Sequence, residues 1–388
     1  MNKRIFPPPP IVLLSALAIL LACFHESLIE WWCLRDLPKS LNQIYGETTQ
    51  NKISVYCFED GFRAQIPIFK SSSGFYTSYD FNENYLKGLD TVYVSVNGKD
   101  ENSGSSRAEA KRTIESALHT RAQTIIMTSG VYRAGENFCS DVSLVNVNLI
   151  GEGDVVVDNV HCPPMVIKGN VFIRNIEFIN GSRGSLRTYI DNPNDVCTYI
   201  NCKFNKSLVD NEDIGKAQSL GGLRIQGGTH YLYKCEASYN GLDGFSYHSA
   251  PDGSTNSPHV VEVECKAFHN GEKNAYESNN ASTAHDGTHI IRLNCEYGYS
   301  HGGNVADVHK NTISFNLGCT SYSVWDLGTA NRTFQSNYFC ASGAVMYLLG
   351  CKSYGSYYDL SCWGKGVLFT DRNYKNNYVK DGTFTLLR

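Results

Sequence analysis

Strong net charge is the first feature that this chain of 388 residues lacks. Its 34 Lys and Arg residues stand against 38 Asp and Glu residues, which leaves a formal net charge of -4. Nucleic acids and anionic membrane surfaces are bound through clustered positive charge. The balance therefore gives no case for a nucleic-acid partner. Zinc-signature spacings of Cys and His are lacking as well, and we expect no metal site of that kind.

A long apolar run is also lacking, because the N-terminal stretch Ile11–Phe24 is shorter than the about 20 residues that span a bilayer. It follows the basic start MNKR, and this pattern is typical of a secretory leader. The letters LLAC, ending at Cys23, resemble a bacterial lipobox, which implies lipidation of Cys23. An uncleaved signal anchor is the alternative. We expect residues 1–24 to be a leader or anchor, and the body to be exported to the bacterial cell envelope or secreted. Membrane contact is then expected only through this anchor or lipid.

Cysteine, by contrast, is abundant, with 14 residues, and half of these recur at regular intervals. The intervals are 33, 30, 30, 24, 21 and 22 residues, and the recurring set is Cys202, Cys235, Cys265, Cys295, Cys319, Cys340 and Cys362. Repeats of this length indicate a solenoid. Apolar residues alternate with period two before several of these cysteines, which predicts strands. We expect one buried, mostly reduced cysteine in each coil, stacked at the strand spacing of about 4.8 Å. Cys33 and Cys57 are the better disulfide candidates.

The stretches YVSVNGKDENSG, TIESAL and TIIMTSGVYR resemble the opening of right-handed parallel β-helix proteins of the pectin-lyase-like superfamily. The following VNLIGEGDVVVDN and VFIRNIEFINGS resemble their first full coils. The resemblance predicts an all-β, right-handed parallel β-helix over residues 89–388. At about 25 residues per coil, residues 121–371 would form roughly ten coils. A helix over about Arg107–Thr120 is expected to cap its open end. Residues 25–88 are interpreted as a linker or small N-terminal cap.

Aligning two coils on Cys265 and Cys295 places His259 opposite His289 and Glu262 opposite Arg292. Counting back from the cysteines with period two predicts that Glu262 and Arg292 point outward, one coil apart. They form either a surface ion pair or part of a charged floor for a sugar chain.

Six of the 11 histidines fall within 62 residues and are interleaved with acidic residues. Two stacked carboxylates, expected here at Glu277 and Asp307, raise each other's pKa and suit acid–base work. A polar ladder that satisfies turn backbone groups is the structural alternative. The candidate catalytic residues are Asp243, His248, Glu277, His285, Asp286, His289, Asp307 and His309. The candidate substrate-binding residues are Tyr247, Tyr276 and Arg292.

The resemblance implies action on a polysaccharide, because the superfamily includes lyases, epimerases and glycoside hydrolases. A histidine or aspartate would move the proton and Arg292 would neutralise a uronate carboxylate. Elimination, epimerisation and hydrolysis stay open. The alternative is a non-catalytic glycan-binding or structural surface protein, since fold does not decide function. The acidic run Val209–Gly215 is either a Ca²⁺ site or an ordinary solvated turn.

Overall fold

The computed structural model describes residues 43–44, 52–53, 66–88, 90–207, 221–249, 256–271, 279–325 and 335–388. Several expectations concern residues outside this set. They are the leader 1–24 with Cys23, the disulfide candidates Cys33 and Cys57, the acidic run Val209–Gly215, and the site candidates Tyr276 and Glu277. Within the described residues, no helix combines the length and the apolar character that crossing a membrane requires.

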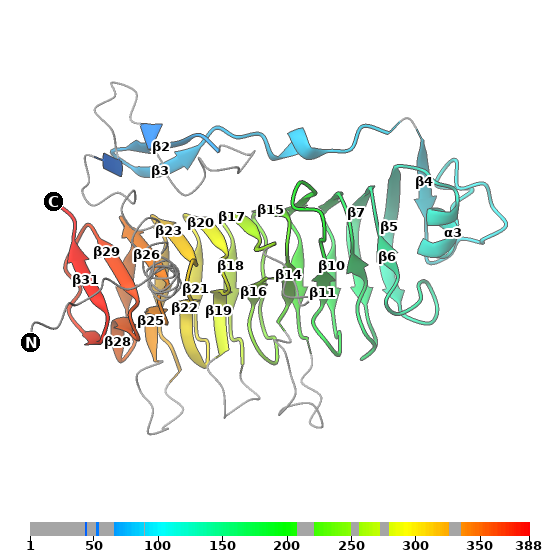
Figure 1. Cartoon of the computed structure of the whole chain (residues 1–388). Helices are drawn as coiled ribbons and strands as arrows, with labels where there is room; N and C mark the ends of the chain where they lie inside the picture. Colours follow the sequence, from blue (N-terminus) through cyan, green and yellow to red (C-terminus); the bar gives the residue numbers. More distant parts are fainter. Residues whose placement is uncertain are drawn as a thin grey trace, which may run out of the picture.

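The described chain forms a solenoid in which each coil contributes strands to three faces (Figure 1). The first face contains β4 (Thr91–Val94), β5 (Thr124–Arg133), β7 (Val147–Asp158), β9 (Val171–Arg174), β12 (Val196–Ile200), β15 (Thr229–Tyr233), β17 (His259–Val263), β20 (His289–Leu293), β23 (Ile313–Leu317), β26 (Val345–Leu349), β29 (Val367–Thr370) and β31 (Thr383–Leu386).

The second face begins with the C-terminal halves of the long strands β5 and β7. It continues with β10 (Glu177–Ile179), β13 (Lys203–Asn205), β18 (Lys266–Phe268), β21 (Glu296–Gly298), β24 (Thr320–Tyr322) and β27 (Lys352–Tyr354). The third face contains β6 (Ser143–Leu144), β8 (Val166–Ile167), β11 (Leu186–Thr188), β14 (Leu223–Gln226), β16 (Phe245–His248), β19 (Asn279–Ala284), β22 (Gly302–Val308), β25 (Ser336–Ala341), β28 (Tyr358–Trp363) and β30 (Asn377–Lys380).

Neighbouring strands on every face pair in parallel, and each pairs with the strand one coil away. This register confirms the parallel β-helix expected from the sequence. Ten successive coil strands, β5 to β29, stand on the first face in the described residues, as the repeat length predicted. The interior holds one long apolar core to which all three faces contribute.

The cysteine row is confirmed for Cys202, Cys235, Cys265, Cys295 and Cys319. Each lies just before a residue of the second-face register and is buried in the core. The next member is Cys351, because Thr320 pairs with Lys352. Cys340 and Cys362 pair with each other on the third face and form a separate row, so their assignment to the first row was wrong. The eleven described cysteines are free thiols.

Thiols of this row also hold successive coils together. Cys265 Sγ donates to the Leu232 carbonyl at 3.3 Å, and Cys319 Sγ donates to the Arg292 carbonyl at 3.2 Å. Each acceptor belongs to the preceding coil. A cysteine at this position therefore fills the core as a small apolar residue and satisfies one backbone carbonyl.

A left-handed residue marks the corner between the first and second faces. The row consists of Asn175, Asn201, Lys234, Glu264, Asn294, Gly318 and Gly350, all with φ between 51° and 67°. Such a residue breaks the alternation of side chains, so period two does not continue through it. Val260 and Cys265, on either side of Glu264, both face the interior, whereas Val261 and Val263 face outward.

The expected orientation of Glu262 and Arg292 was therefore wrong. They are register neighbours, as the cysteine alignment predicted, but both side chains lie fully buried inside the solenoid. The prediction counted back from Cys265 and Cys295 with period two and so passed through Glu264 and Asn294. Each of these left-handed corner residues shifts the inward–outward alternation of the side chains by one residue.

The expected capping helix is present but shorter than predicted. Helix α3 runs over Ile114–His119 and lies beside β4 at the N-terminal end of the solenoid (Figure 1). Thr113 is its N-cap and accepts a hydrogen bond from Ser116 N. Lys111 cannot belong to the helix, because its backbone pairs with Tyr93 and Ser95 at β4.

The outer side of the first face is apolar and is covered by residues 66–88, which the sequence analysis assigned to a linker or cap. This strap contains β2 (Ile68–Ser71), β3 (Gly74–Thr77) and the 3-10 helix η2 (Phe81–Asn84), and Figure 1 shows it running along the solenoid. The short strand β1 (Lys52–Ile53) pairs with β2. Near the start of the strap, the backbone carbonyl of Phe75 accepts a hydrogen bond from Asn294 Nδ2 at 2.7 Å.

Farther along the strap, Phe81 stacks on Tyr233 with ring centres 4.8 Å apart. Near its end, Leu86 N donates to Asn148 Oδ1 at 2.9 Å. The strap thus crosses the coils from the C-terminal part of the solenoid to the N-terminal part, and closes a second apolar cluster outside the coil interior.

Candidate active site

Four of the expected site residues meet on the outer side of the third face, at the C-terminal ends of β16, β19 and β22. Tyr247 pairs with Ala284, so His248 and His285, which follow them, stack on one another, and His309 lies two residues after Asp307, the partner of Ala284. The ring of His248 lies parallel to that of His285, with centres 4.4 Å apart and an angle of 15°. The ring of His309 meets that of His285 edge-on at 5.4 Å.

Asp286 joins this histidine cluster from the turn after β19. Its Oδ1 lies 2.6 Å from His309 Nδ1, and its Oδ2 lies 3.7 Å from His248 Nδ1. These contacts with His248 and His309 hold the pKa of Asp286 well below its ordinary value, so the carboxylate is charged. The hydrogen bond to Asp286 raises the pKa of His309 in return.

The pKa values of the two stacked imidazoles, His248 and His285, are shifted in the opposite direction to that of His309. Burial lowers the pKa of His248, against the opposing contact with Asp286. Burial, helped by the charges of His248 and His309, lowers the pKa of His285 well below its ordinary value. Hydroxyl groups fix both rings: Ser246 Oγ lies 2.9 Å from His248 Nε2, and Thr283 Oγ1 lies 2.8 Å from His285 Nε2. The cluster therefore offers neutral imidazoles next to one that is readily charged.

Two arginines that were not among the candidates expected from the sequence extend the site toward the N-terminal coils. Arg187 pairs with Arg224, and Arg224 pairs with Ser246, so all three belong to one outward row. Burial lowers the pKa of Arg224 to about 10, which still leaves it charged at neutral pH. Its charge contributes to the lowered pKa of His248. Aligning LRIQ, Leu223–Gln226, with FSYH, Phe245–His248, would have placed Arg224 on this face.

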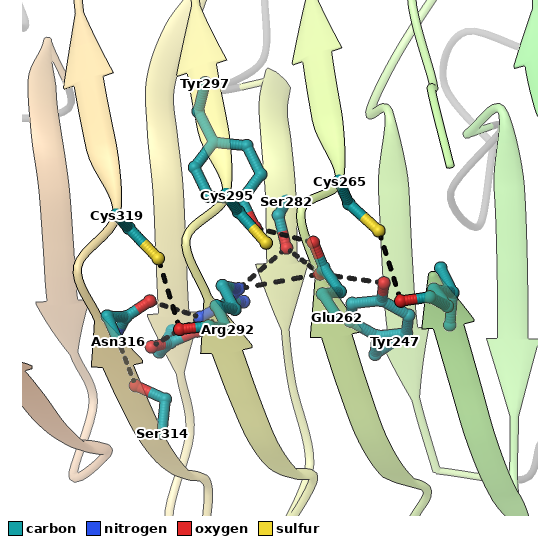
Figure 2. A network of polar contacts seen from close by, with 12 residues as sticks. Tyr247, Glu262, Cys265, Ser282, Arg292, Cys295, Tyr297, Ser314, Asn316 and Cys319 are labelled. Carbon is teal, nitrogen blue, oxygen red and sulfur yellow. Dashed lines mark hydrogen bonds and ion pairs between the residues drawn. The ribbon is translucent and has the colours of Figure 1, made fainter. Parts of the chain in front are cut away.

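Three other expected residues face the interior and belong to a buried network (Figure 2). Tyr247 Oη donates to Glu262 Oε1 at 2.8 Å. Arg292 donates to both carboxylate oxygens of Asp307, at 3.0 and 3.3 Å. Tyr247, Arg292 and Asp307 are fully buried, so the expectation that they act on substrate was wrong.

Glu262 lies at the centre of the same network. It also accepts from Ser282 Oγ at 2.7 Å and from Tyr297 Oη at 2.5 Å, and Arg292 Nε is 3.7 Å from its Oε1. Burial raises the pKa of Glu262 to about 7. Asp307 and Glu262 outweigh the effect of burial and raise the pKa of Arg292, which stays charged.

Among the described residues, one group has ligand-type atoms close enough to hold a metal ion: Glu262, Cys265 and Cys295, within 4.8 Å of one another. Tyr247, Ser282 and Tyr297 already donate to both oxygens of that carboxylate. Burial raises the pKa of the Cys265 and Cys295 thiols, whereas a metal binds the thiolate. We assign no metal to it.

The remaining candidates lie elsewhere. Asp243 is buried below the cluster, where its Oδ1 accepts from Asn280 N at 2.8 Å and its Oδ2 accepts from Ser246 Oγ at 3.3 Å. It ties two coils together. His289 stands on the first face, 5.2 Å from His259. It is therefore not part of the cluster.

The expected stacking of Glu277 with Asp307 used a fixed offset of twelve residues from each cysteine. The register instead places Ala284 between Tyr247 and Asp307. The coil that begins at Cys265 has extra residues before β19, so a constant offset selects the wrong position.

No family model matches the chain, and no curated protein matches its sequence. Among solved structures, the fold is similar to the pectate lyase Pel9A, with a TM-score of 0.43, 14% identity, and coverage of 70% of this chain and 78% of that one. It is also similar to a rhamnogalacturonan lyase, with a TM-score of 0.32, 10% identity and 72% coverage of each chain.

A third similar structure is the GH136 lacto-N-biosidase from Eubacterium ramulus, with a TM-score of 0.30 and 8% identity, covering 76% of this chain and 67% of that one. Likeness of this degree carries no information about chemistry. The parallel β-helix itself follows from the strand register.

Proposed function

We propose that the chain acts on a polysaccharide that contains uronate residues, by removing a proton next to the uronate carboxylate. The observation that carries the proposal is the separation of pKa values around one carboxylate. His248 has a lowered pKa and His309 a raised one, and both contact Asp286. Groups whose environments push their pKa values apart in this way suit the base and the acid of one reaction.

Each residue has a distinct part in this proposal. Neutral His248 takes the proton from C5. Arg224, whose register partner Ser246 lies two residues before His248, faces the uronate carboxylate and stabilises the negative charge that develops there. His309, as imidazolium, gives a proton to the departing glycosidic oxygen or, in an epimerisation, to the opposite face of C5. Asp286 orients both imidazoles. Hydrolysis is less well supported, since it uses two carboxylates and Asp286 is the cluster's carboxylate in the described residues.

The test is turnover of uronate polymers by the full chain. Purified protein is incubated with polygalacturonate, rhamnogalacturonan, alginate and hyaluronan, and the absorbance of unsaturated product, new reducing ends and C5 inversion by NMR are followed. We expect His248→Gln to lower kcat by about 100-fold or more. The matched control is His289→Gln on the first face, which should retain activity. Absence of turnover on every uronate polymer, or full activity of His248→Gln, would contradict the proposal.

We also propose that the chain is exported by its N-terminal segment, with Cys23 as the lipidated residue. The basic start and the short apolar run of the sequence support this. Mass spectrometry of the protein recovered from the cell envelope tests it. A mature N-terminus at a diacylglyceryl Cys23 is expected, and an intact Met1 in the cytosolic fraction would refute export.

A further inference from the structure

An exposed strip of aromatic side chains lies on the second face and its corner with the third face, away from the histidine cluster. Phe268, Gly298, Tyr322 and Tyr354 share one register position across β18, β21, β24 and β27. The rings of Tyr322 and Tyr354 are parallel at 5.2 Å, with an angle of 3°. Tyr354 is 53% exposed. The side chain of Tyr354 is therefore accessible to solvent.

The adjoining corner continues the strip. Tyr239, His269 and Tyr299 stack in consecutive coils, with ring centres 5.0 and 4.9 Å apart and angles of 7° and 5°. Trp325 stands edge-on to His269 at 6.1 Å. Tyr239 is 56% and Trp325 43% exposed. These rings and the row on the second face together form the aromatic strip.

The three stacked corner residues adopt a backbone conformation that is unfavourable for aromatic side chains. Tyr239, His269 and Tyr299 have φ values of 60°, 55° and 55°, where bulky side chains are disfavoured. The first corner has the same left-handed geometry but uses Asn and Gly at most of its positions, among them Asn294 and Gly318. Exposed rings regain little through burial, so folding alone does not account for aromatic residues at this corner.

Contact with a partner does account for them. The outer side of the first face is equally rich in aromatic residues, but there the strap covers them. The strip instead leaves three large rings substantially open to solvent. Part of the charge on the second face is paired, as in Lys266–Glu296 at 3.3 Å and, at the first corner, Lys234–Glu264 at 3.6 Å. The strip itself is aromatic, and it favours a partner with flat apolar faces and hydroxyl groups.

We propose that the aromatic strip binds a neutral glycan chain that lies along the coil axis. Pyranose rings present apolar C–H faces to aromatic rings and hydroxyl groups to a polar rim. A chain of sugars repeats at a length similar to the coil spacing of about 4.8 Å, so successive rings of the strip meet equivalent parts of the ligand. Tyr239, His269 and Tyr299 belong to the same three coils that end in His248, His285 and His309. The strip thus lies on the same coils as the histidine cluster but on another part of their surface, and takes no part in the chemistry proposed for the cluster.

Affinity electrophoresis of the full chain in gels that contain soluble galactomannan, xyloglucan or mixed-linkage glucan tests the strip. We expect retardation of the wild type by at least one of them. The double variant Tyr239→Ala/Tyr354→Ala should bind roughly tenfold more weakly, because two stacking contacts are lost. The matched control is Tyr76→Ala, which removes a tyrosine of similar exposure, 49%, from the strap. Its mobility should equal that of the wild type.

The binding assay is independent of the proposed uronate chemistry. His248→Gln should be retarded like the wild type, even if no uronate polymer is ever turned over. Wild-type mobility that is the same with and without every glycan would overturn the inference. So would a larger elution volume of the double variant in size-exclusion chromatography, since the strip would then be a contact between two copies of this chain. Unchanged urea midpoints of the variants show that the exposed substitutions leave the fold intact.

Discussion

At the scale of single residues, Glu262 and Arg292 show how strongly the solenoid interior depends on a few buried charges. Arg292 lies between two carboxylates, Glu262 and Asp307, and all three are fully buried. Such ions are tolerated because each is paired and hydrogen-bonded, and loss of one partner leaves an uncompensated charge. The network therefore holds neighbouring coils in register inside the solenoid.

The pH dependence of stability should reveal Glu262. Its pKa rises from an ordinary 4.5 to about 7 in the folded protein because of burial. Between these values the folded state binds a proton that the unfolded state has released, so this stabilisation is complete below pH 4.5 and is lost as the pH rises through 7. Urea unfolding at pH 5 and pH 8 should therefore show that the stability of the wild type relative to Glu262→Gln is greater at pH 5. An equal difference at the two pH values would count against it.

Asp286 and His309 give a second prediction at this scale. The pKa of His309 is raised above 6.5 by its hydrogen bond to Asp286, and that of Asp286 is lowered below 3.8 by contacts with His248 and His309. The pair thus stabilises the fold most between pH 3.8 and 6.5; this is lost below that range as Asp286 is protonated, and above it as His309 is deprotonated. NMR titration should place the His309 midpoint above 6.5 in the wild type and lower in Asp286→Asn. A midpoint that does not move would refute the contact.

At the scale of elements, the left-handed corners decide which side of each strand faces the core. The first corner uses Asn and Gly at several positions but Lys234 and Glu264 at others, all with φ above 50°. In a sequence, Gly and Asn are the residue types that predict such a left-handed conformation. A corner made by Lys or Glu looks like a continuation of the strand, and this is why the faces of Glu262 and Arg292 were predicted wrongly.

Alanine substitutions at two left-handed glycines should separate the cost of backbone strain from the cost of overpacking. Gly350 has φ of 65°, and a Cβ there would lie 2.7 Å from Phe75 Cε2 of the strap; Gly135 has φ of 81° and nothing within 4 Å. Gly135→Ala should cost about 1 kcal/mol from strain alone. Gly350→Ala should cost about 2–4 kcal/mol, because overpacking adds to strain. Urea unfolding measures both. Equal costs would mean that the strap does not press on this corner.

At the scale of the whole molecule, the described residues form two large apolar clusters, one inside the coils and one between the first face and the strap, besides a small third one. A free β-helix exposes only its outer side chains, and here one outer side is itself apolar. The strap is therefore part of the folded unit, because without residues 66–88 a long apolar surface along the first face would meet water.

Removal of one strap ring tests this. Phe81 is buried and stacks on Tyr233, so Phe81→Ala should lower the free energy of unfolding by about 3–4 kcal/mol. It should also increase the binding of an apolar dye, because the first face is uncovered. Tyr76→Ala, on the exposed side of the strap, should change stability by about 0.5 kcal/mol or less. Dye binding and stability like those of the wild type in Phe81→Ala would show that the strap is dispensable.

By itself the sequence determined the repeat, the parallel β-helix, the row of cysteines up to Cys319, and the concentration of histidine and acid that supplies His248, His285, Asp286 and His309. These follow from periodicity and spacing, which are local properties of the chain. The tertiary structure alone decided that Arg292 and Asp307 are interior, that Arg224 completes the cluster, and that residues 66–88 cover the first face. Hydrogen bonding between coils sets the register, and left-handed corners and extra loop residues shift it by amounts that residue types such as Glu264 do not reveal.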